Sequence, residues 1–236
     1  MYMATTLDKE NFFEFSDWES AKKASQGYSN EFLVNEYFEI NSKNKFEEIE
    51  IYPPRFIELF CAIQKCLRGK EILKVADYGG GNGYLGVYAK RFLNMPIHWE
   101  VFEQKEFVKI YQQIINEDIL FRDLEEYRKE KYDITLFSCS IQYIENWREI
   151  VENSIKNSDY LIITRMPITS YGKDQVTVQK VWIRDKEFSW PAYFFSEETI
   201  NYFNSIGKII YRWNTPTEKV LFQGKEVEFQ GLILSK

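Results

Sequence analysis

Residues 75–83 read Val-Ala-Asp-Tyr-Gly-Gly-Gly-Asn-Gly, a short apolar run that ends in an acid and continues into glycines at alternate positions. The pattern predicts a buried strand that enters a tight turn, because glycine tolerates unusual backbone angles and places no side chain in the path of a ligand. A helix that begins near Gly83 would point its free N–H groups at the turn. The segment therefore indicates the binding site of a nucleotide-like cofactor.

Strand and helix patterns alternate along the central part of the chain. The expected strands are residues 72–76, 97–102, 119–121, 132–138 and 160–164, with helical patterns between them. Such alternation predicts a mainly parallel sheet with helices on both faces. Two late apolar segments, 209–213 and 226–234, have only a turn-rich stretch between them, so we expect them to pair antiparallel.

The segments that flank this pattern define the expected domains. Residues 1–50 are polar and rich in aromatic side chains, and we interpret them as an N-terminal helical cap. Pro53-Pro54 marks a break, and residues 51–236 are expected to form the α/β domain. Residues 166–195 interrupt the alternation and are interpreted as an insertion that follows the fifth strand.

The composition narrows the classes of function. The chain has 236 residues, 44% of them hydrophobic, and a formal net charge of −6, which predicts a folded domain without a general nucleic-acid-binding surface. Three scattered cysteines and a single histidine, His98, argue against a Cys/His metal site. The N-terminus lacks the pattern of a signal peptide, and no apolar run approaches the roughly 20 residues of a membrane span. We therefore expect a cytoplasmic protein that binds no metal.

The glycine loop can be read in two ways. Gly81, Gly83 and Gly86 match the dinucleotide fingerprint glycine-x-glycine-x-x-glycine. The segment from Asp77 to Gly83 instead resembles the first motif of class I S-adenosylmethionine (SAM)-dependent methyltransferases, in which an acid stands two residues before the first glycine. A carboxylate there would repel a pyrophosphate but attract the ammonium and sulfonium groups of SAM. Asp77 therefore favours the methyl donor, unless it only caps the turn.

A second acid supports a nucleoside in either reading. Glu103 ends the second expected strand, about 20 residues beyond the glycine loop, where a carboxylate can accept both ribose hydroxyls in a bidentate hydrogen bond. The alternative is a surface acid that happens to stand at the end of a strand.

The resemblance to class I methyltransferases continues over residues 55–236. It implies an acid near the adenine amino group at Asp123 and a residue beside the donor methyl at Ser138. It also implies a Rossmann-like, doubly wound sheet of seven strands in the order 3-2-1-4-5-7-6, with only strand 7 antiparallel. The residues implied to bind the cofactor are Asp77, Gly79, Gly81, Gly83, Glu103, Asp123 and Ser138.

A narrower resemblance concerns the acceptor. Residues 17–21, 27–28, 164–167 and 176–179 resemble features of an uncharacterised bacterial group of methyltransferase-like proteins associated with surface-polysaccharide genes. This resemblance implies a small-molecule or saccharide acceptor. The absence of an Asn/Asp-Pro-Pro-Tyr motif after the fourth strand argues against an enzyme that methylates nucleic-acid bases.

The candidate catalytic residues are chosen by position. Gln142 and Tyr143 follow the fourth strand and Arg165 ends the fifth, so all three should face the crevice at the carboxyl ends of the strands. Arg165 can pair with a carboxylate or phosphate of the acceptor, or form an internal salt bridge. Tyr143 can orient or deprotonate a hydroxyl, or simply pack. His98 begins the second strand, away from this edge, and is expected to be structural.

The segment 166–195 is a candidate lid over the acceptor, through Gln179, Trp190 and Tyr193, and Tyr28 of the N-terminal segment is expected to assist. The alternative is that the aromatic side chains only bury the insertion against the core. The leading hypothesis is a SAM-dependent methyltransferase that transfers the methyl group in line to a small-molecule or saccharide-linked acceptor. An NAD(P)-dependent oxidoreductase is the first alternative. A methyltransferase-like protein that binds without catalysis is the second.

Overall fold

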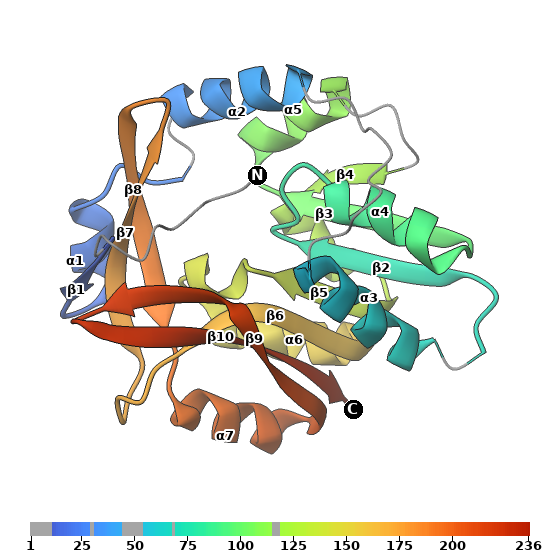
Figure 1. The fold of residues 1–236 in the computed structure, drawn as a ribbon. Helices are drawn as coiled ribbons and strands as arrows, with labels where there is room; N and C mark the ends of the chain where they lie inside the picture. Colours follow the sequence, from blue (N-terminus) through green and yellow to red (C-terminus); the bar gives the residue numbers. More distant parts are fainter. Residues whose placement is uncertain (1–10, 29–30, 44–53, 68, 115–118) are drawn as a thin grey trace.

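The computed structural model describes residues 11–28, 31–43, 54–67, 69–114 and 119–236, and the expectations that fall on other residues lie outside it. A sheet of seven strands forms the centre (Figure 1). Its strands, in spatial order, are β4 (Ile119–Asp123), β3 (Ile97–Glu103), β2 (Leu73–Tyr78), β5 (Tyr132–Ser138), β6 (Ser158–Ile168), β10 (Lys225–Ser235) and β9 (Lys208–Phe222).

The first five of these strands are parallel, whereas β10 runs antiparallel to both β6 and β9. Counted along the chain within this sheet, the spatial order is 3-2-1-4-5-7-6. The Rossmann-like α/β class expected from the alternating pattern is confirmed. Because the carboxyl ends of β2, β3, β5 and β6 meet at one edge, the segments that follow these strands lie close together there.

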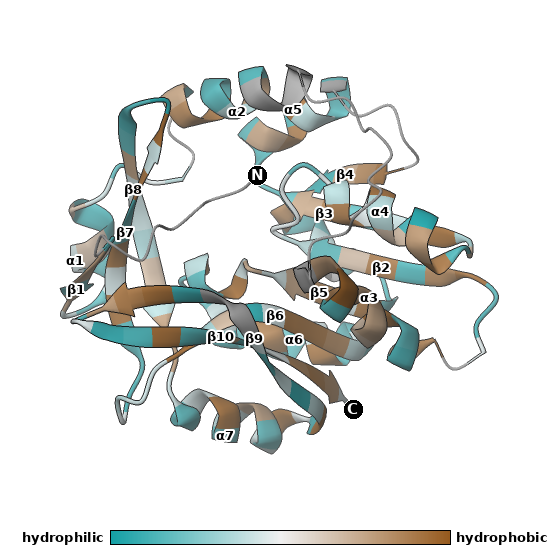
Figure 2. Cartoon of the chain, in the orientation of Figure 1, coloured by the Kyte–Doolittle hydropathy of each residue, from teal (hydrophilic) through white to brown (hydrophobic). Residues whose placement is uncertain are grey.

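Helices cover both faces of the sheet, and two clusters of buried hydrophobic side chains separate them from it. The helices and 3-10 turns are α3 (Pro54–Cys66), α4 (Tyr84–Leu93), α5 (Lys105–Ile114), η1 (Leu124–Lys129), η2 (Ile141–Tyr143), α6 (Trp147–Asn157) and α7 (Glu197–Ile206). Hydrophobic residues concentrate along the central strands, while the tip of the β7–β8 hairpin is hydrophilic (Figure 2).

A second sheet joins the two segments that flank the α/β pattern. It consists of β1 (Phe12–Phe15), β7 (Gln175–Ile183) and β8 (Lys186–Phe194), all antiparallel in the order β1-β7-β8. The segment expected to be a helical cap does hold α1 (Trp18–Lys23) and α2 (Glu31–Lys43), but its described residues also include the strand β1. The sequence pattern missed this strand because a four-residue strand acquires its structure from a partner more than 150 residues away.

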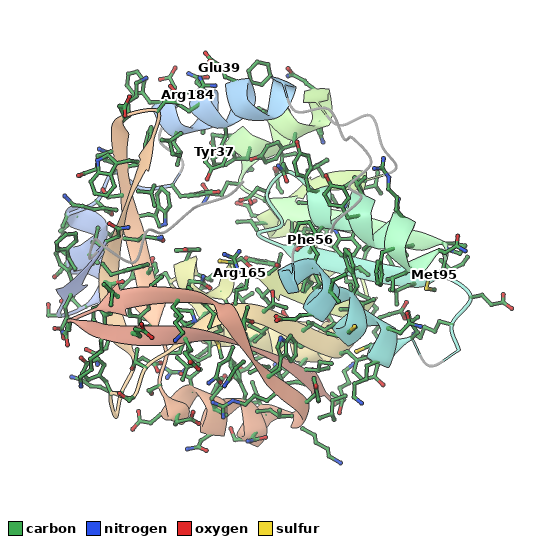
Figure 3. All side chains as sticks on the ribbon, in the orientation of Figure 1. Tyr37, Glu39, Phe56, Met95, Arg165 and Arg184 are labelled. Carbon is green, nitrogen blue, oxygen red and sulfur yellow. The ribbon has the colours of Figure 1, made fainter. Side chains whose placement is uncertain are left out.

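Ion pairs attach the hairpin tip to α2. Arg184 lies in the turn between β7 and β8, and its guanidinium is 3.2 Å from Glu36 and 2.6 Å from Glu39; Figure 3 shows the Arg184 and Glu39 side chains side by side. Lys186 adds a third contact, 3.0 Å from Glu36. The inner faces of β7, β8 and α2 share a core with the α/β domain, and burial of these faces stabilises the arrangement more than exposed ion pairs can.

The late strand pair is longer than expected. Where we predicted a turn-rich stretch after residue 213, β9 continues to Phe222 and the turn is Gln223-Gly224, both residues with positive φ. The register shifts because Glu228 pairs with Lys219 while the next residue, Phe229, pairs with Thr215. Residues 216–218 form a bulge, which is where a strand accommodates a proline such as Pro216.

Gly86 has a packing role that bears on the dinucleotide reading of the loop. A Cβ atom at position 86 would lie 2.7 Å from the indole ring of Trp99, which is fully buried. We therefore expect Gly86→Ala to lower the free energy of unfolding by about 1–2 kcal/mol, because overpacking outweighs the gain in helix propensity.

Urea unfolding measures this effect. The matched control is Gly172→Ala, where an added Cβ meets no atom within 4 Å and where we expect a change within about 0.5 kcal/mol. A Gly86→Ala variant as stable as the wild type would contradict the packing role.

Candidate functional site

The glycine loop follows β2 and leads into α4. Gly79, Gly81 and Gly83 all have positive φ, at 70°, 58° and 74°. A Cβ at Gly79 would lie 2.6 Å from the Cβ of Ser140, whereas one at Gly81 would meet no atom within 4 Å. Gly79 is therefore required for close packing against the segment after β5, and Gly81 is the glycine whose backbone borders open space.

Asp77 lies beneath this loop and is fully buried. Its Oδ2 accepts a hydrogen bond of 3.2 Å from the indole nitrogen of Trp99, and its Oδ1 is sealed from water without a hydrogen-bond partner. A Cβ at Gly80 would lie 2.5 Å from the carboxyl carbon, so the loop covers the acid. Burial raises the pKa of Asp77 to about 7. The hydrogen bond from Trp99 opposes this rise, whereas the negative charge of Glu103 adds to it.

Glu103 lies at the end of β3, beside the open part of the loop. Its Oε2 accepts the Gly81 N–H at 3.2 Å and its Oε1 accepts the Gln104 N–H at 2.9 Å. Burial raises its pKa to about 7, and the two hydrogen bonds work against that rise. The site therefore holds two buried carboxyl groups that ionise near neutral pH and act on one another.

Aromatic side chains from the N-terminal segment and the hairpin face this edge. The ring centroid of Tyr28 is 5.0 Å from Phe107 of α5 and 5.2 Å from Trp190 of β8. Tyr37 of α2 packs edge-on against Phe107 at 5.6 Å, and its hydroxyl is hydrogen-bonded to Tyr28. The charge of Glu103 contributes to the raised pKa values of both tyrosines, although burial is the main cause. The cluster of Tyr28, Tyr37, Phe107 and Trp190 therefore lies next to Glu103.

Asp123 and Ser138 lie at the carboxyl ends of β4 and β5. Asp123 caps η1 in a capping box with Glu126, in which the Asp123 N–H donates to Glu126 Oε1 at 3.4 Å. Ser138 Oγ accepts a hydrogen bond of 3.2 Å from Thr164 Oγ1. Both residues therefore lie at the carboxyl ends of the strands, as predicted, and both also have hydrogen-bond partners within the chain.

Tyr143 is held in the interior next to the hairpin. Its hydroxyl donates to Gln179 Oε1 at 2.8 Å, and the indole nitrogen of Trp190 donates to the same oxygen at 3.2 Å. Burial raises the pKa of Tyr143 far above its ordinary value, while the nearby charge of Arg165 works in the opposite direction. A phenol that stays protonated at neutral pH can orient an acceptor but does not act as its base.

Gln142 and Arg165 lie in the same region. Gln142 Nε2 is 3.2 Å from the sulfur of Cys139, and its Oε1 is sealed from water without a hydrogen-bond partner. Arg165 is half-buried and has a positive φ of 57° near the end of β6. Figure 3 shows Tyr37 and Arg165 on opposite sides of the central region between the two sheets.

Tyr193 does not join the other residues of the expected lid. Side chains alternate along β8, so Tyr193 lies on the face opposite Trp190. Its ring stacks on Trp18 at 4.5 Å and its hydroxyl donates to the carbonyl of Glu145 at 3.3 Å. There it lines a separate surface pocket of about 530 Å³, next to the N-termini of α6 and α7. Tyr193 is thus separated from Gln179 and Trp190, with which it was expected to act, and the alternation of side chains along β8 predicts this separation.

His98 lies away from this edge, at the other end of β3, with its Nε2 2.6 Å from Glu100 Oε1. Within the described ranges, no cluster of three or more His, Cys, Asp or Glu side chains is arranged to hold a metal ion. Within the same ranges, no helix is long and apolar enough to cross a membrane.

Similarity to known proteins is found in the fold and not in the sequence, since no protein-family model and no curated protein matches the chain. The N-terminal domain of EvdMO1, solved in the presence of S-adenosylhomocysteine (SAH) and D-fucose, matches with a TM-score of 0.57 and 10% identity over 89% of this chain and 98% of that one. The structure of 1,6-didemethyltoxoflavin-N1-methyltransferase from Burkholderia thailandensis, bound to SAH, matches with a TM-score of 0.51 and 12% identity over 86% of this chain and 87% of that one.

The glycopeptide N-methyltransferase MtfA, complexed with SAH, matches with a TM-score of 0.50 and 9% identity over 81% of this chain and 94% of that chain. A protein from Listeria monocytogenes that is assigned to the class I SAM-dependent methyltransferases matches with a TM-score of 0.51 and 12% identity, over 92% of this chain and 71% of that one. At these identities the likeness shows the fold alone. The chain has the fold of class I SAM-dependent methyltransferases.

The raised pKa of Asp77 predicts how stability depends on pH. Its ordinary pKa is 3.8 and its folded-state pKa about 7, so the folded state binds the proton more tightly, and this contribution to stability is lost as pH rises through 7. We expect Asp77→Asn to raise the free energy of unfolding at pH 8 by on the order of 1–3 kcal/mol, and much less at pH 5.

Urea unfolding at the two pH values measures the difference. Asp159→Asn is the control, because the Asp159 side chain is 57% exposed and its loss should bring no pH-dependent gain. Equal effects of Asp77→Asn at pH 5 and pH 8 would rule out the raised pKa.

Proposed function

We propose that the protein is a SAM-dependent methyltransferase that transfers a methyl group in line to a small-molecule or saccharide-linked acceptor. The observation that carries the proposal is the pair of buried carboxyl groups, Asp77 and Glu103, on either side of a glycine loop whose Gly81 backbone borders open space. The methyltransferase fold supports it, as does the presence of D-fucose in the structure of the EvdMO1 domain.

In this proposal the loop of Gly79, Gly81 and Gly83 forms the floor of the donor site. Glu103 accepts the ribose hydroxyls, and it already points at the loop through its bond to the Gly81 N–H. Asp77 is covered by Gly80, so it acts on the cationic donor through its charge and not by direct contact. Asp123 would lie near the adenine and Ser138 near the donor methyl.

The acceptor would lie beyond Ser138, against Tyr143, Gln142 and Arg165 and under the hairpin of residues 166–195. The chain's task there is to place the nucleophile in line with the carbon–sulfur bond, since positioning supplies much of the acceleration of such a transfer. Tyr143 keeps its proton and donates a hydrogen bond to Gln179 Oε1, which supports an orienting role for the phenol. The segment 1–50 would close the site together with the hairpin, and residues 51–236 would form the catalytic domain.

The NAD(P)-dependent alternative is disfavoured by the carboxyl groups of the site and not by Gly86. The third glycine of a dinucleotide fingerprint also serves close packing of helix and strand, so the contact of Gly86 with Trp99 fits either reading. A pyrophosphate above Asp77 would meet two carboxyl groups near their pKa values, and this interaction becomes more repulsive as pH rises.

Titration calorimetry with SAM, SAH and NAD⁺ tests the donor site. We expect both SAM and SAH to bind, and Glu103→Gln to weaken binding by about 10- to 100-fold through loss of charge-assisted hydrogen bonds to the ribose. Glu106→Gln, an exposed acid on the next helix, should bind like the wild type. Binding of NAD⁺ without SAM or SAH would overturn the proposal, whereas donor binding without turnover on a broad acceptor panel would favour a non-catalytic protein.

The pH dependence of donor binding provides an independent test. Because a cationic donor favours the ionised forms of Asp77 and Glu103, its binding lowers pKa values that lie near 7 and releases protons. We expect SAM affinity to increase from pH 6 to pH 8, with proton release detected at pH 6.5 in buffers of different ionisation enthalpy. Asp77→Asn should release fewer protons, and pH-independent affinity in the wild type would contradict this assignment.

A further inference from the structure

Two backbone positions with unusual φ angles lie side by side at the edge of the sheet where the acceptor is proposed to bind. Of the six non-glycine residues with positive φ in the described chain, four lie in a helix cap or a hairpin turn, where such angles are common: Asn94, Arg184, Asp185 and Gln223. The other two are Cys139, with φ of 59°, and Arg165, with φ of 57°. Cys139 directly follows β5 and Arg165 lies within the neighbouring strand β6, and the Cys139 N–H donates to the carbonyl of Thr164 at 3.0 Å.

A β-bulge gives Arg165 its conformation. Along β6 and β10, Ile163 pairs with Leu232 but Met166 pairs with Gln230, so two residues of β6 stand opposite Gly231 alone. Bulges of this kind redirect a side chain, and strained residues persist mainly where the surrounding structure holds them for a purpose. Figure 3 shows Arg165 at the central region between the two sheets, and its positive charge opposes the rise in the pKa of Tyr143.

Gln179 presents a fixed donor to the same region. An indole nitrogen can only donate, so the atom facing Trp190 Nε1 must be the amide oxygen, and the same oxygen also accepts the Tyr143 hydroxyl. The amide nitrogen is thereby turned the other way. Among the described residues, Gln179 Nε2 has no hydrogen-bond acceptor. The residue as a whole is only 4% exposed, but its Nε2 retains some contact with solvent.

We propose that Arg165 and Gln179 form a subsite for an anionic oxygen group, a carboxylate or a phosphate, carried by the acceptor. A guanidinium and an amide NH₂ are complementary to such a group and leave no acceptor atom of their own pointing at it. Arg165 also has a contact within the chain, and the five N–H donors of a guanidinium allow it to hold more than one partner. As an acceptor site the subsite rests on the proposed function, but its affinity for anions does not.

Acetate and inorganic phosphate are the probes, titrated at constant ionic strength into the SAH-loaded protein and into the protein alone, with D-glucose as the neutral control. The indole N–H resonance of Trp190, assigned with Trp190→Phe, reports on the site because this group is bonded to Gln179. We expect one or both anions to shift this resonance with saturable, millimolar affinity and glucose to leave it unchanged. A response to acetate alone assigns a carboxylate, and a response to phosphate alone assigns a phosphate.

Arg165→Gln should weaken anion binding about tenfold or more, and Gln179→Ala provides a second variant should the first fail to fold. The matched control is Arg184→Gln, which removes another arginine of positive φ at the hairpin tip and should leave anion affinity unchanged. Equal responses to all three probes, no response to either anion, or full affinity in Arg165→Gln would overturn the subsite. Loss of SAH binding with anion binding retained would instead overturn the proposed methyltransferase.

Discussion

The hydrogen bond between the indole of Trp99 and the carboxylate of Asp77 determines the shape of the site. It joins β3 to β2 beneath the glycine loop, at a point where both side chains are fully buried. Gly80 has no room for a side chain because the carboxylate lies below it, and Gly86 has none because the indole lies beside it. One bonded pair thus requires glycine at positions 80 and 86, whereas Gly79 is required by its contact with Ser140.

The packing of the hairpin against the segment after β5 depends on two hydrogen bonds that share one acceptor. Gln179 Oε1 receives hydrogen bonds from Tyr143, which follows β5, and from Trp190 in the hairpin. One amide oxygen therefore connects the α/β sheet to the second sheet. Because β1 of the N-terminal segment pairs with β7, the N-terminal segment, the hairpin and the α/β sheet are coupled, and a change in the hairpin would alter the environment of Tyr143.

The sequence predicted local features well and distant ones poorly. The conformation of the loop from Asp77 to Gly83 can be predicted from the sequence because glycine spacing is a local property. The parallel strands can be predicted because a buried parallel strand is apolar along its length. The pairing of Phe12–Phe15 with β7 depends on a contact between distant segments. The role of Gly86 depends on Trp99 in another strand, and the strain at Arg165 depends on the register of β6 against β10. None of these long-range relations leaves a periodic pattern in one sequence.

Two buried carboxyl groups that ionise near pH 7 make the ligand-free site unfavourable whenever both are charged. A core would normally replace such groups with apolar side chains. Here one of them is sealed under the loop and the other is bonded to the Gly81 N–H, so neither can escape into water by a change of rotamer. A cationic ligand relieves this repulsion as it binds, and an anionic pyrophosphate increases it. The stability that the fold gives up at Asp77 and Glu103 above pH 7 is recovered by protonation at lower pH, and under the proposed function a ligand of positive charge recovers it at neutral pH.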